Sequence, residues 1–235
     1  MKIEVLYPEI CNLYGDLMNA EYLARSAGAE LVRTSLKEQP AFTRENIDLV
    51  YMGCTTEQGQ LLARDALRPY MDAIRKRIDD SGATLVTGNA LEIFGEYIDA
   101  DDGEKIEMLG LFPTYAKRRL MERHNSFYVG EFDGEKVVGF KSQFGHSYGN
   151  PEEGLFATVK GVGLNPETPW EGLRRENFMA TYLIGPVAVM NPPFAKSLLV
   201  LMGAENVTLA HEEAAMEVYE TRVREFLEPE RKAEY

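Results

Sequence analysis

The sequence predicts an α/β protein with an open, mostly parallel sheet that carries helices on both faces and an antiparallel extension. In the N-terminal half, short and nearly continuous apolar runs alternate with amphipathic segments, which is typical of parallel strands joined by helices. A buried strand at 83–87 then passes through a glycine corner into helical sequence. Between residues 103 and 159, short strand-like runs follow one another closely, which favours antiparallel pairing. No long linker separates these parts, so we expect a single domain over residues 1–235.

Strands and helices alternate in the N-terminal half. Thr55 and Gln58 have the spacing of a capping box, which indicates a helix start, and Pro69 predicts a kink further along the same helix. Ligands of open α/β sheets bind beyond the C-terminal ends of the strands, so the loops 53–56 and 88–90 should lie together at one edge. The expected strands are 2–7, 30–34, 47–52 and 83–87, and the expected helices are 17–26 (closed by Gly28), 55–78 and a segment opening at 91–94.

The C-terminal half is expected to begin with antiparallel strands and to end with helices. Asp133-Gly134 separates two strand-like runs and is a strong hairpin signal. Gly145, Gly149 and Asn150-Pro151 predict a loop. The other expected elements are strands at 108–112, 127–132, 136–140, 155–159 and 177–183, a loop at 166–169, and helices at 193–202 and 209–227.

Composition excludes several classes of partner. The 235 residues are 45% apolar and 27% charged, with a formal net charge of −13, so neither nucleic acid nor an anionic membrane surface is an expected partner. The basic clusters at 75–77 and 117–119 are short and are expected to be solvated. No apolar window approaches about 18 residues, the first residues resemble a strand rather than a signal peptide, and two cysteines make no disulfide framework. We therefore expect a cytoplasmic protein.

The segment from 83 to 94 has the shape of a nucleophile elbow. In that device a strand turns sharply into a helix, the corner residue projects above the sheet, and backbone amides at the helix N-terminus can hold an anion. Here the corner is Gly88-Asn89-Ala90, which offers neither a thiol nor a hydroxyl. The sequence thus predicts the scaffold of a hydrolase without its reactive atom.

Four segments carry a family resemblance: NLYGD at 12–16, GCT at 53–55 followed by Glu57-Gln58, GNALEIFG at 88–95 and ATYLIGP at 180–186. In this order they resemble a class I glutamine amidotransferase domain of the CobB/CobQ type. Within that family the chain is most similar to the GatD-like glutaminase subunit of lipid II isoglutaminyl synthase, which partners a Mur-ligase-like protein. The resemblance covers most of the chain and implies the flavodoxin-like sheet of the class I glutamine amidotransferase fold.

The resemblance also implies that both catalytic positions have been lost. The family's cysteine aligns with Gly88 and its histidine with Ile184. Glycine cannot attack an amide and isoleucine cannot transfer a proton, so no intact catalytic pair remains. The family's elbow glutamine is Glu92, while Cys54 and Thr55 stand where the oxyanion loop usually has glycines.

Three interpretations follow. In the first, the chain is a catalytically silent binding or regulatory subunit of a Mur-ligase-like or other ATP-dependent amide synthetase, in peptidoglycan or cobalamin biosynthesis. Its pocket would hold glutamine or another small polar ligand. The residues expected in this pocket are Gly53, Cys54, Thr55, Gly88, Asn89, Ala90, Glu92 and His146.

In the second interpretation, the chain is an active glutamine amidotransferase or another hydrolase that uses Cys54 in the same cleft. A helix N-terminus beside Cys54 would lower the pKa of its thiol, and His146 is the candidate base. In the third, the chain is a structural subunit whose acidic C-terminal helix docks on a basic surface. No His, Cys or carboxylate residues show metal-ligand spacing, so neither a metal nor a cofactor is expected.

Overall fold

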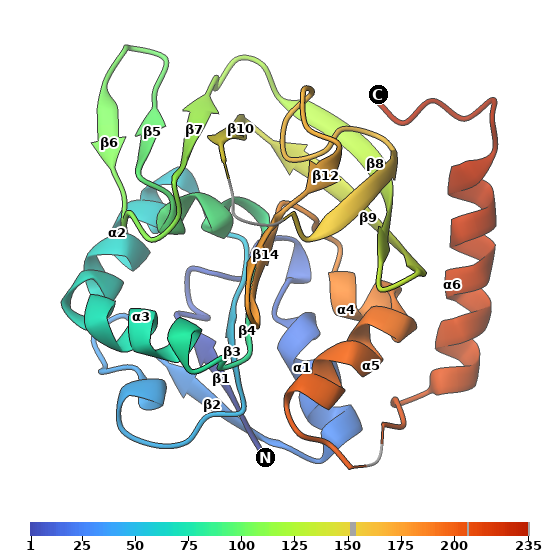
Figure 1. Cartoon of the computed structure of the whole chain (residues 1–235), viewed down its shortest axis with the longest axis horizontal. Coiled ribbons are helices and arrows are strands. Elements are labelled where there is room, and N and C mark those ends of the chain that lie inside the picture. The colour runs from blue at the N-terminus through green and yellow to red at the C-terminus, as the bar shows by residue number, and fades with distance from the viewer. Residues whose placement is uncertain (151–153, 206, 235) are drawn as a thin grey trace.

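A six-stranded sheet lies at the centre of the computed structural model, which describes residues 1–150, 154–205 and 207–234 (Figure 1). The strand order is β13-β14-β4-β3-β1-β2, and all neighbours are parallel except β13, which pairs antiparallel with β14 at one edge. Every residue of β3 (LVYM) and β4 (TLVT) is buried. These apolar and β-branched residues are typical of central strands that are covered on both faces. The strands are β1 (Lys2–Leu6), β2 (Glu30–Thr34), β3 (Leu49–Met52), β4 (Thr84–Thr87), β13 (Leu173–Arg175) and β14 (Phe178–Thr181).

Helices cover both faces of this sheet, which confirms the predicted fold class. Successive strand residues point to opposite faces, so Val5 packs with α1 and α5 while Leu6 packs with α2 and α3. Gly28 closes α1 with a left-handed φ of 62°, and Pro69 interrupts the helical segment between α2 and α3, both as predicted. The helices are α1 (Met18–Ala27), α2 (Glu57–Leu67), α3 (Met71–Asp79), α4 (Val187–Met190), α5 (Pro192–Leu201) and α6 (Glu212–Leu227), with 3-10 turns η1 (Leu13–Gly15), η2 (Ala41–Thr43), η3 (Arg68–Tyr70) and η4 (Gly88–Phe94).

Two four-stranded sheets form the extension, in the orders β10-β7-β5-β6 and β12-β11-β8-β9. All of their pairs are antiparallel except β5 with β7, and the β8–β9 hairpin turns at Asp133-Gly134 as predicted. Helix α6 packs on this hairpin through Tyr219 and Phe226. The strands are β5 (Tyr97–Asp99), β6 (Lys105–Glu107), β7 (Thr114–Arg118), β8 (His124–Phe132), β9 (Glu135–Gln143), β10 (Gly145–Gly149), β11 (Phe156–Lys160) and β12 (Trp170–Glu171).

Some predicted elements are wrong. The apolar run 108–112 is a loop whose amides donate to carbonyls of the 93–96 segment, so it fills the core without pairing as a strand. Conversely, residues 145–149 form strand β10 rather than a loop, because they pair with β7; Pro151 lies outside the described residues. Strands β5, β6 and β7 were not predicted, because 97–99 and 105–107 are too short and too polar to give a strand pattern.

Two predictions about helix starts also need correction. The N-cap of α2 is Thr56 and not Thr55: the Thr56 hydroxyl accepts a hydrogen bond of 3.0 Å from the Gly59 amide. The helix expected to open at 91–94 is only the 3-10 turn η4, which ends at Gly95. Within the described residues, no helix has the length and apolar character needed to cross a bilayer.

Candidate functional site

The loops that follow β1, β3 and β4 meet at the carboxyl edge of the central sheet, and a buried carboxylate holds them together. Asp16, in the loop after β1, has no exposed surface. Its Oδ2 accepts hydrogen bonds from the Cys54 amide (2.9 Å) and the Thr87 hydroxyl (2.5 Å). One carboxylate therefore fixes the loop after β3 against the end of β4.

The hydrogen-bond network around Asp16 extends to α4. The Tyr51 hydroxyl donates to the main-chain carbonyl of Asp16 (2.7 Å), and the Asn19 side chain donates to the Tyr51 hydroxyl (3.0 Å) and accepts from the Ala188 amide (2.7 Å). Burial raises the pKa of Asp16 to about 6, although each of its hydrogen bonds lowers it. Asp16 lies in the NLYGD motif, and here it acts as a structural junction of the site.

Cys54 occupies the space above the elbow. Gly88 has a left-handed φ of 63°, so the sharp corner of an elbow is present. A Cβ built on Gly88 would lie 2.5 Å from the Cβ of Cys54 and 2.6 Å from its Sγ, far inside van der Waals contact. The side chain of Cys54 therefore excludes any side chain at the position where the family resemblance places the nucleophile.

The thiol of Cys54 is poorly suited to attack. Its side chain is buried, and it donates a hydrogen bond to the Asn89 side-chain oxygen (3.3 Å). Burial and, next, the nearby Asp16 carboxylate raise the pKa of Cys54 to about 12. The expectation that the N-terminus of α2 lowers this pKa is wrong, because the cost of burying the thiolate outweighs the effect of the helix.

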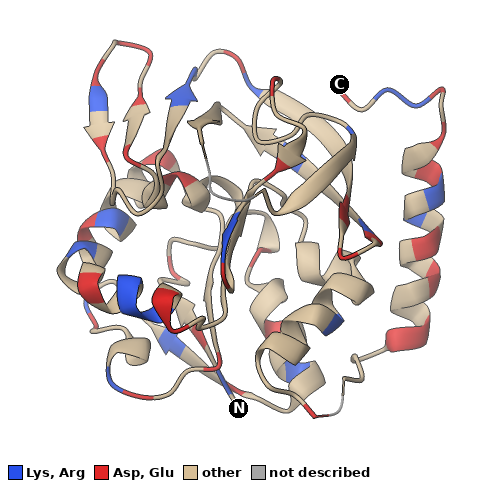
Figure 2. Ribbon diagram, viewed as in Figure 1, with Lys and Arg blue, Asp and Glu red and all other residues tan. Residues whose placement is uncertain are grey.

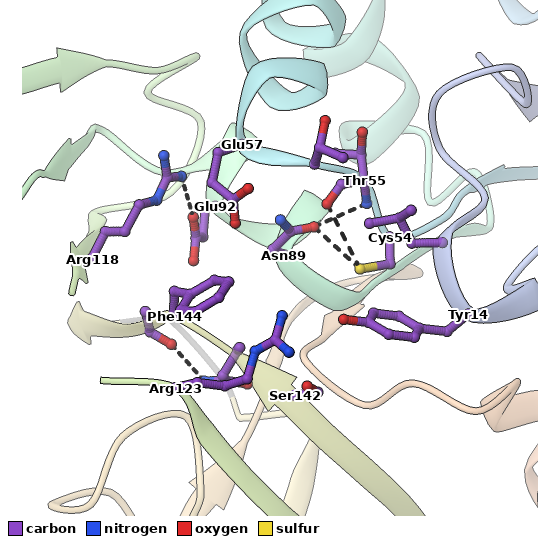
Figure 3. Close-up of a pocket in the computed structure, with 14 residues that line it drawn as sticks. Tyr14, Cys54, Thr55, Glu57, Asn89, Glu92, Arg118, Arg123, Ser142 and Phe144 are labelled. Carbon is purple, nitrogen blue, oxygen red and sulfur yellow. Dashed lines mark hydrogen bonds and ion pairs between the residues drawn. The ribbon is translucent and has the colours of Figure 1, made fainter. Parts of the chain in front are cut away.

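Asn89 fills the anion-binding position of the elbow. Its Oδ1 accepts a hydrogen bond of 3.0 Å from the Thr55 amide, and Figure 3 shows this oxygen lying between Cys54 and Thr55. Its main-chain oxygen accepts from Gln60 (2.5 Å). An amide donor that could stabilise a developing oxyanion is thus already bound to a neutral side chain of the same protein.

Neither candidate position for a base forms a hydrogen bond with the thiol in the described chain. Ile184 is buried, and its main chain pairs with Phe140 (N–H···O, 2.9 Å). The ring of His146 packs on that of His124, with centroids 5.1 Å apart, and its Nδ1 is 3.3 Å from Gln143. Burial lowers the pKa of His146 to about 4. In the described chain, no imidazole is among the hydrogen-bond partners of Cys54.

A buried ion pair replaces the polar elbow glutamine. Glu92 accepts hydrogen bonds from Arg118 (3.0 Å) and Gln60 (2.9 Å) on one oxygen and from the Tyr182 hydroxyl (3.1 Å) on the other. The side chains of Glu92 and Arg118 are almost fully buried. Arg118 was not predicted as a site residue, because the basic cluster 117–119 was expected to be solvated. Successive side chains of β7 point to opposite sides of the strand, and of this cluster only Arg118 points into the protein.

These residues surround a cavity of about 170 Å³. Four of the predicted pocket residues line it: Cys54, Thr55, Asn89 and Glu92. The other four, Gly53, Gly88, Ala90 and His146, are not among its lining residues. Glu92 was the one charged residue predicted in the pocket, but Arg118, Arg123 and Glu57 also line the cavity, with the rings of Tyr14 and Phe144 nearby (Figure 3).

Comparison with known proteins identifies the family of this chain. The CobB/CobQ-like glutamine amidotransferase domain matches residues 2–191, so the chain belongs to that family. It is 25% identical over 210 residues to the GatD subunit of lipid II isoglutaminyl synthase (glutamine-hydrolyzing) from Streptococcus pneumoniae, covering 85% of this chain and 79% of that protein. The GatD subunit from Staphylococcus aureus is 24% identical over 192 residues, covering 80% and 78%.

A solved structure shows the same fold. The crystal structure of a glutamine amidotransferase superposes with a TM-score of 0.56 at 15% identity, covering 85% of this chain and 98% of that one. The predicted class I glutamine amidotransferase fold and the predicted resemblance to GatD are therefore confirmed.

Proposed function

We propose that this chain is a GatD-like subunit that does not hydrolyse glutamine and that serves a Mur-ligase-like amide synthetase as a binding or regulatory subunit in cell-wall precursor metabolism. The observation that carries the proposal is the absence of a nucleophile at the corner of the elbow. Gly88 has no side chain, and the space above it holds the side chain of Cys54.

Glutamine hydrolysis by a cysteine enzyme requires a thiolate, a proton-transfer group and donors for the oxyanion. A thiol with a pKa of about 12 is ionised in only about one molecule in 10⁵ at pH 7. Among the described residues no histidine is a hydrogen-bond partner of the Cys54 thiol, and the Thr55 amide already donates to Asn89 Oδ1. All three requirements therefore point to a silent site.

The subunit role rests on the relatives. Both GatD proteins are named as subunits of lipid II isoglutaminyl synthase, and this chain matches them over most of their length. A family member that has lost ammonia production can still bind its synthetase, because an interaction surface does not depend on the elbow. We therefore infer that the protein acts in the cytoplasm, where nucleotide-dependent ligation takes place. The similarity to the GatD subunits favours cell-wall metabolism over corrinoid metabolism.

A glutaminase assay tests the loss of activity. The purified chain, alone and with a Mur-ligase-like subunit, is incubated with L-glutamine, and ammonia and glutamate are measured beside a glutamine-hydrolysing GatD subunit as positive control. We expect no release above the buffer blank. Release that disappears in Cys54→Ala would contradict the proposal and support the alternative, an amidotransferase or other hydrolase that uses Cys54.

The subunit role needs a separate measurement. We expect the chain to co-purify with the Mur-ligase-like subunit, and the complex to form the product amide with ammonium chloride but not with glutamine as the nitrogen donor. Amide formation from glutamine by this complex would show that the elbow still works. No association with the synthetase subunit would remove the proposed role while leaving the loss of glutaminase activity intact.

A further inference from the structure

A second cavity, of about 490 Å³, lies between α1, α4 and α6, away from the elbow loops. Figure 1 shows α6 along one edge of the molecule, beside α4 and α5. We call this cavity the α1–α6 groove. Its floor and walls are apolar, and the residues used below are Met18 and Tyr22 from α1, Val189 from α4, and Ala214 and Val218 from α6.

Part of the apolar lining of the α1–α6 groove is uncovered in the monomer, although Tyr22 is buried. Met18 is 45% exposed and Val218 is 52% exposed, although both lie on helices with well-buried faces of their own. Apolar side chains that line a concavity and face water mark an interaction site more often than scattered exposed residues do. Their spacing on α6 (214, 218) is that of one helix face.

Two arginines stand at the rim of the groove. Arg25 and Arg222 line it, and neither forms an ion pair within the described residues, where the nearby Glu225 is paired with Arg231. The acidic residue at the rim, Glu21, is already paired with Arg33 at 3.1 Å. The chain as a whole carries a net charge of −13, and Figure 2 shows acidic residues on many of its elements, including α6. A cationic rim on such a protein is complementary to an acidic segment and not to a basic one.

We propose that the α1–α6 groove binds an amphipathic helix of the synthetase subunit that presents apolar residues flanked by carboxylates. Helices bind such grooves through apolar anchors spaced at i, i+3, i+4 and i+7. The apolar anchors pack between Met18 and Val218, and the carboxylates lie over Arg25 and Arg222. This inference rests on the proposed subunit role and specifies the surface that carries it.

The α6 surface predicted from the sequence differs from this groove. An acidic C-terminal helix suggested docking on a basic partner, but the side of α6 that faces the groove presents Ala214, Val218 and Arg222. Ala214, Val218 and Arg222 also border a neighbouring hollow on α6, which Glu217, Glu225 and Phe140 line on its other side. The test below therefore reverses charge within the groove, where the two ideas predict opposite effects.

The test is a titration of the full-length chain with the purified Mur-ligase-like subunit, measured by isothermal calorimetry. We expect Val218→Glu and Met18→Glu each to weaken binding by about tenfold or more, because each places a carboxylate among the apolar anchors. We expect Arg222→Glu to weaken binding and to reduce its dependence on salt. The matched controls are Val200→Glu, 59% exposed on α5, and Arg224→Glu, exposed on α6 outside the groove. Both should bind within about twofold of the wild type.

Thermal melts of each variant separate folding from binding, and the use of α1 and α6 variants guards against damage to one helix. If the wild type binds and the groove variants bind equally well, the α1–α6 groove is not the docking site, while the subunit role stands. If Arg222→Glu strengthens binding, the segment that binds the groove does not present carboxylates to Arg222, and the proposed acidic helix is ruled out. If the wild type does not bind at all, both the subunit role and the groove proposal fail.

Discussion

Adding a side chain at Gly88 should be one of the most costly small changes in this protein. Gly88→Ala introduces two penalties. A left-handed backbone costs a non-glycine residue about 1–2 kcal/mol. The new Cβ, at 2.5 Å from Cys54 Cβ and 2.6 Å from Sγ, adds about 1–3 kcal/mol of overpacking. We therefore expect the free energy of unfolding to fall by about 2–5 kcal/mol.

The structure offers a matched control for this substitution. Gly110 has nearly the same φ, 64° against 63°, but a Cβ built there meets nothing within 4 Å. Gly110→Ala should therefore show the backbone penalty alone, about 1–2 kcal/mol. The difference between the two alanine variants isolates the contact with Cys54, and urea denaturation at neutral pH measures both.

A double-mutant cycle then tests whether Cys54 is the cause. Cys54→Gly removes the Cβ and Sγ, leaving only Cα at 3.1 Å from the new methyl group. In that background Gly88→Ala should cost about 1–3 kcal/mol less than in the wild type. If the two substitutions instead add within about 0.5 kcal/mol, Cys54 does not exclude a side chain from the elbow and the central observation fails.

Three further predictions concern buried polar groups and a helix cap. The pKa of Asp16 rises to about 6 on folding, so the folded state binds a proton more tightly than the unfolded state. This stabilisation is lost as the carboxyl group ionises. The free energy of unfolding should therefore fall by about 2–3 kcal/mol as pH rises from 4 to 6. In Asp16→Asn that slope should disappear from pH-dependent urea curves, and a slope that persists assigns the titration to another group. Glu92→Gln leaves Arg118 buried without a counter-charge and should lower the free energy of unfolding by about 3 kcal/mol. Asp80→Asn removes one partner of the exposed pair with Lys76 and should change the free energy of unfolding by less than about 1 kcal/mol. Equal effects would show that burial of the Glu92–Arg118 pair makes no difference to stability. Thr56→Ala removes the N-cap of α2 and should cost about 1 kcal/mol by urea denaturation, and an unchanged midpoint would show that the cap contributes nothing.

The central sheet could be predicted because its strands carry their own signal. Residues 47–52 and 83–87 are short runs rich in apolar residues and bounded by glycine, and they form β3 and β4 close to the expected limits. The extension was harder to predict. Residues 108–112 are as apolar as a strand, but their amides bond to the 93–96 segment, a partner that periodicity cannot identify.

The candidate site shows the same division. The loops at Cys54 and Asn89 could be placed at one edge of the sheet, because parallel strands end together there. The contacts that these loops make could not be predicted from the sequence. The thiol lies over Gly88 because Asp16, in a loop 38 residues away, accepts a hydrogen bond from the Cys54 amide. Arg118 was missed for a related reason: it lies on β7, between β10 and β5, and its side chain is buried there because the carboxylate of Glu92 pairs with it.

The steric exclusion between positions 54 and 88 also couples any substitutions made there. The side chain of Cys54 and a side chain at 88 cannot share the space above the elbow, so a side chain introduced at 88 requires a change at 54. A variant with glycine at both positions is only underpacked. A thiol can therefore be engineered at the corner of the elbow only through residue 54, and the order of the two changes is set by sterics.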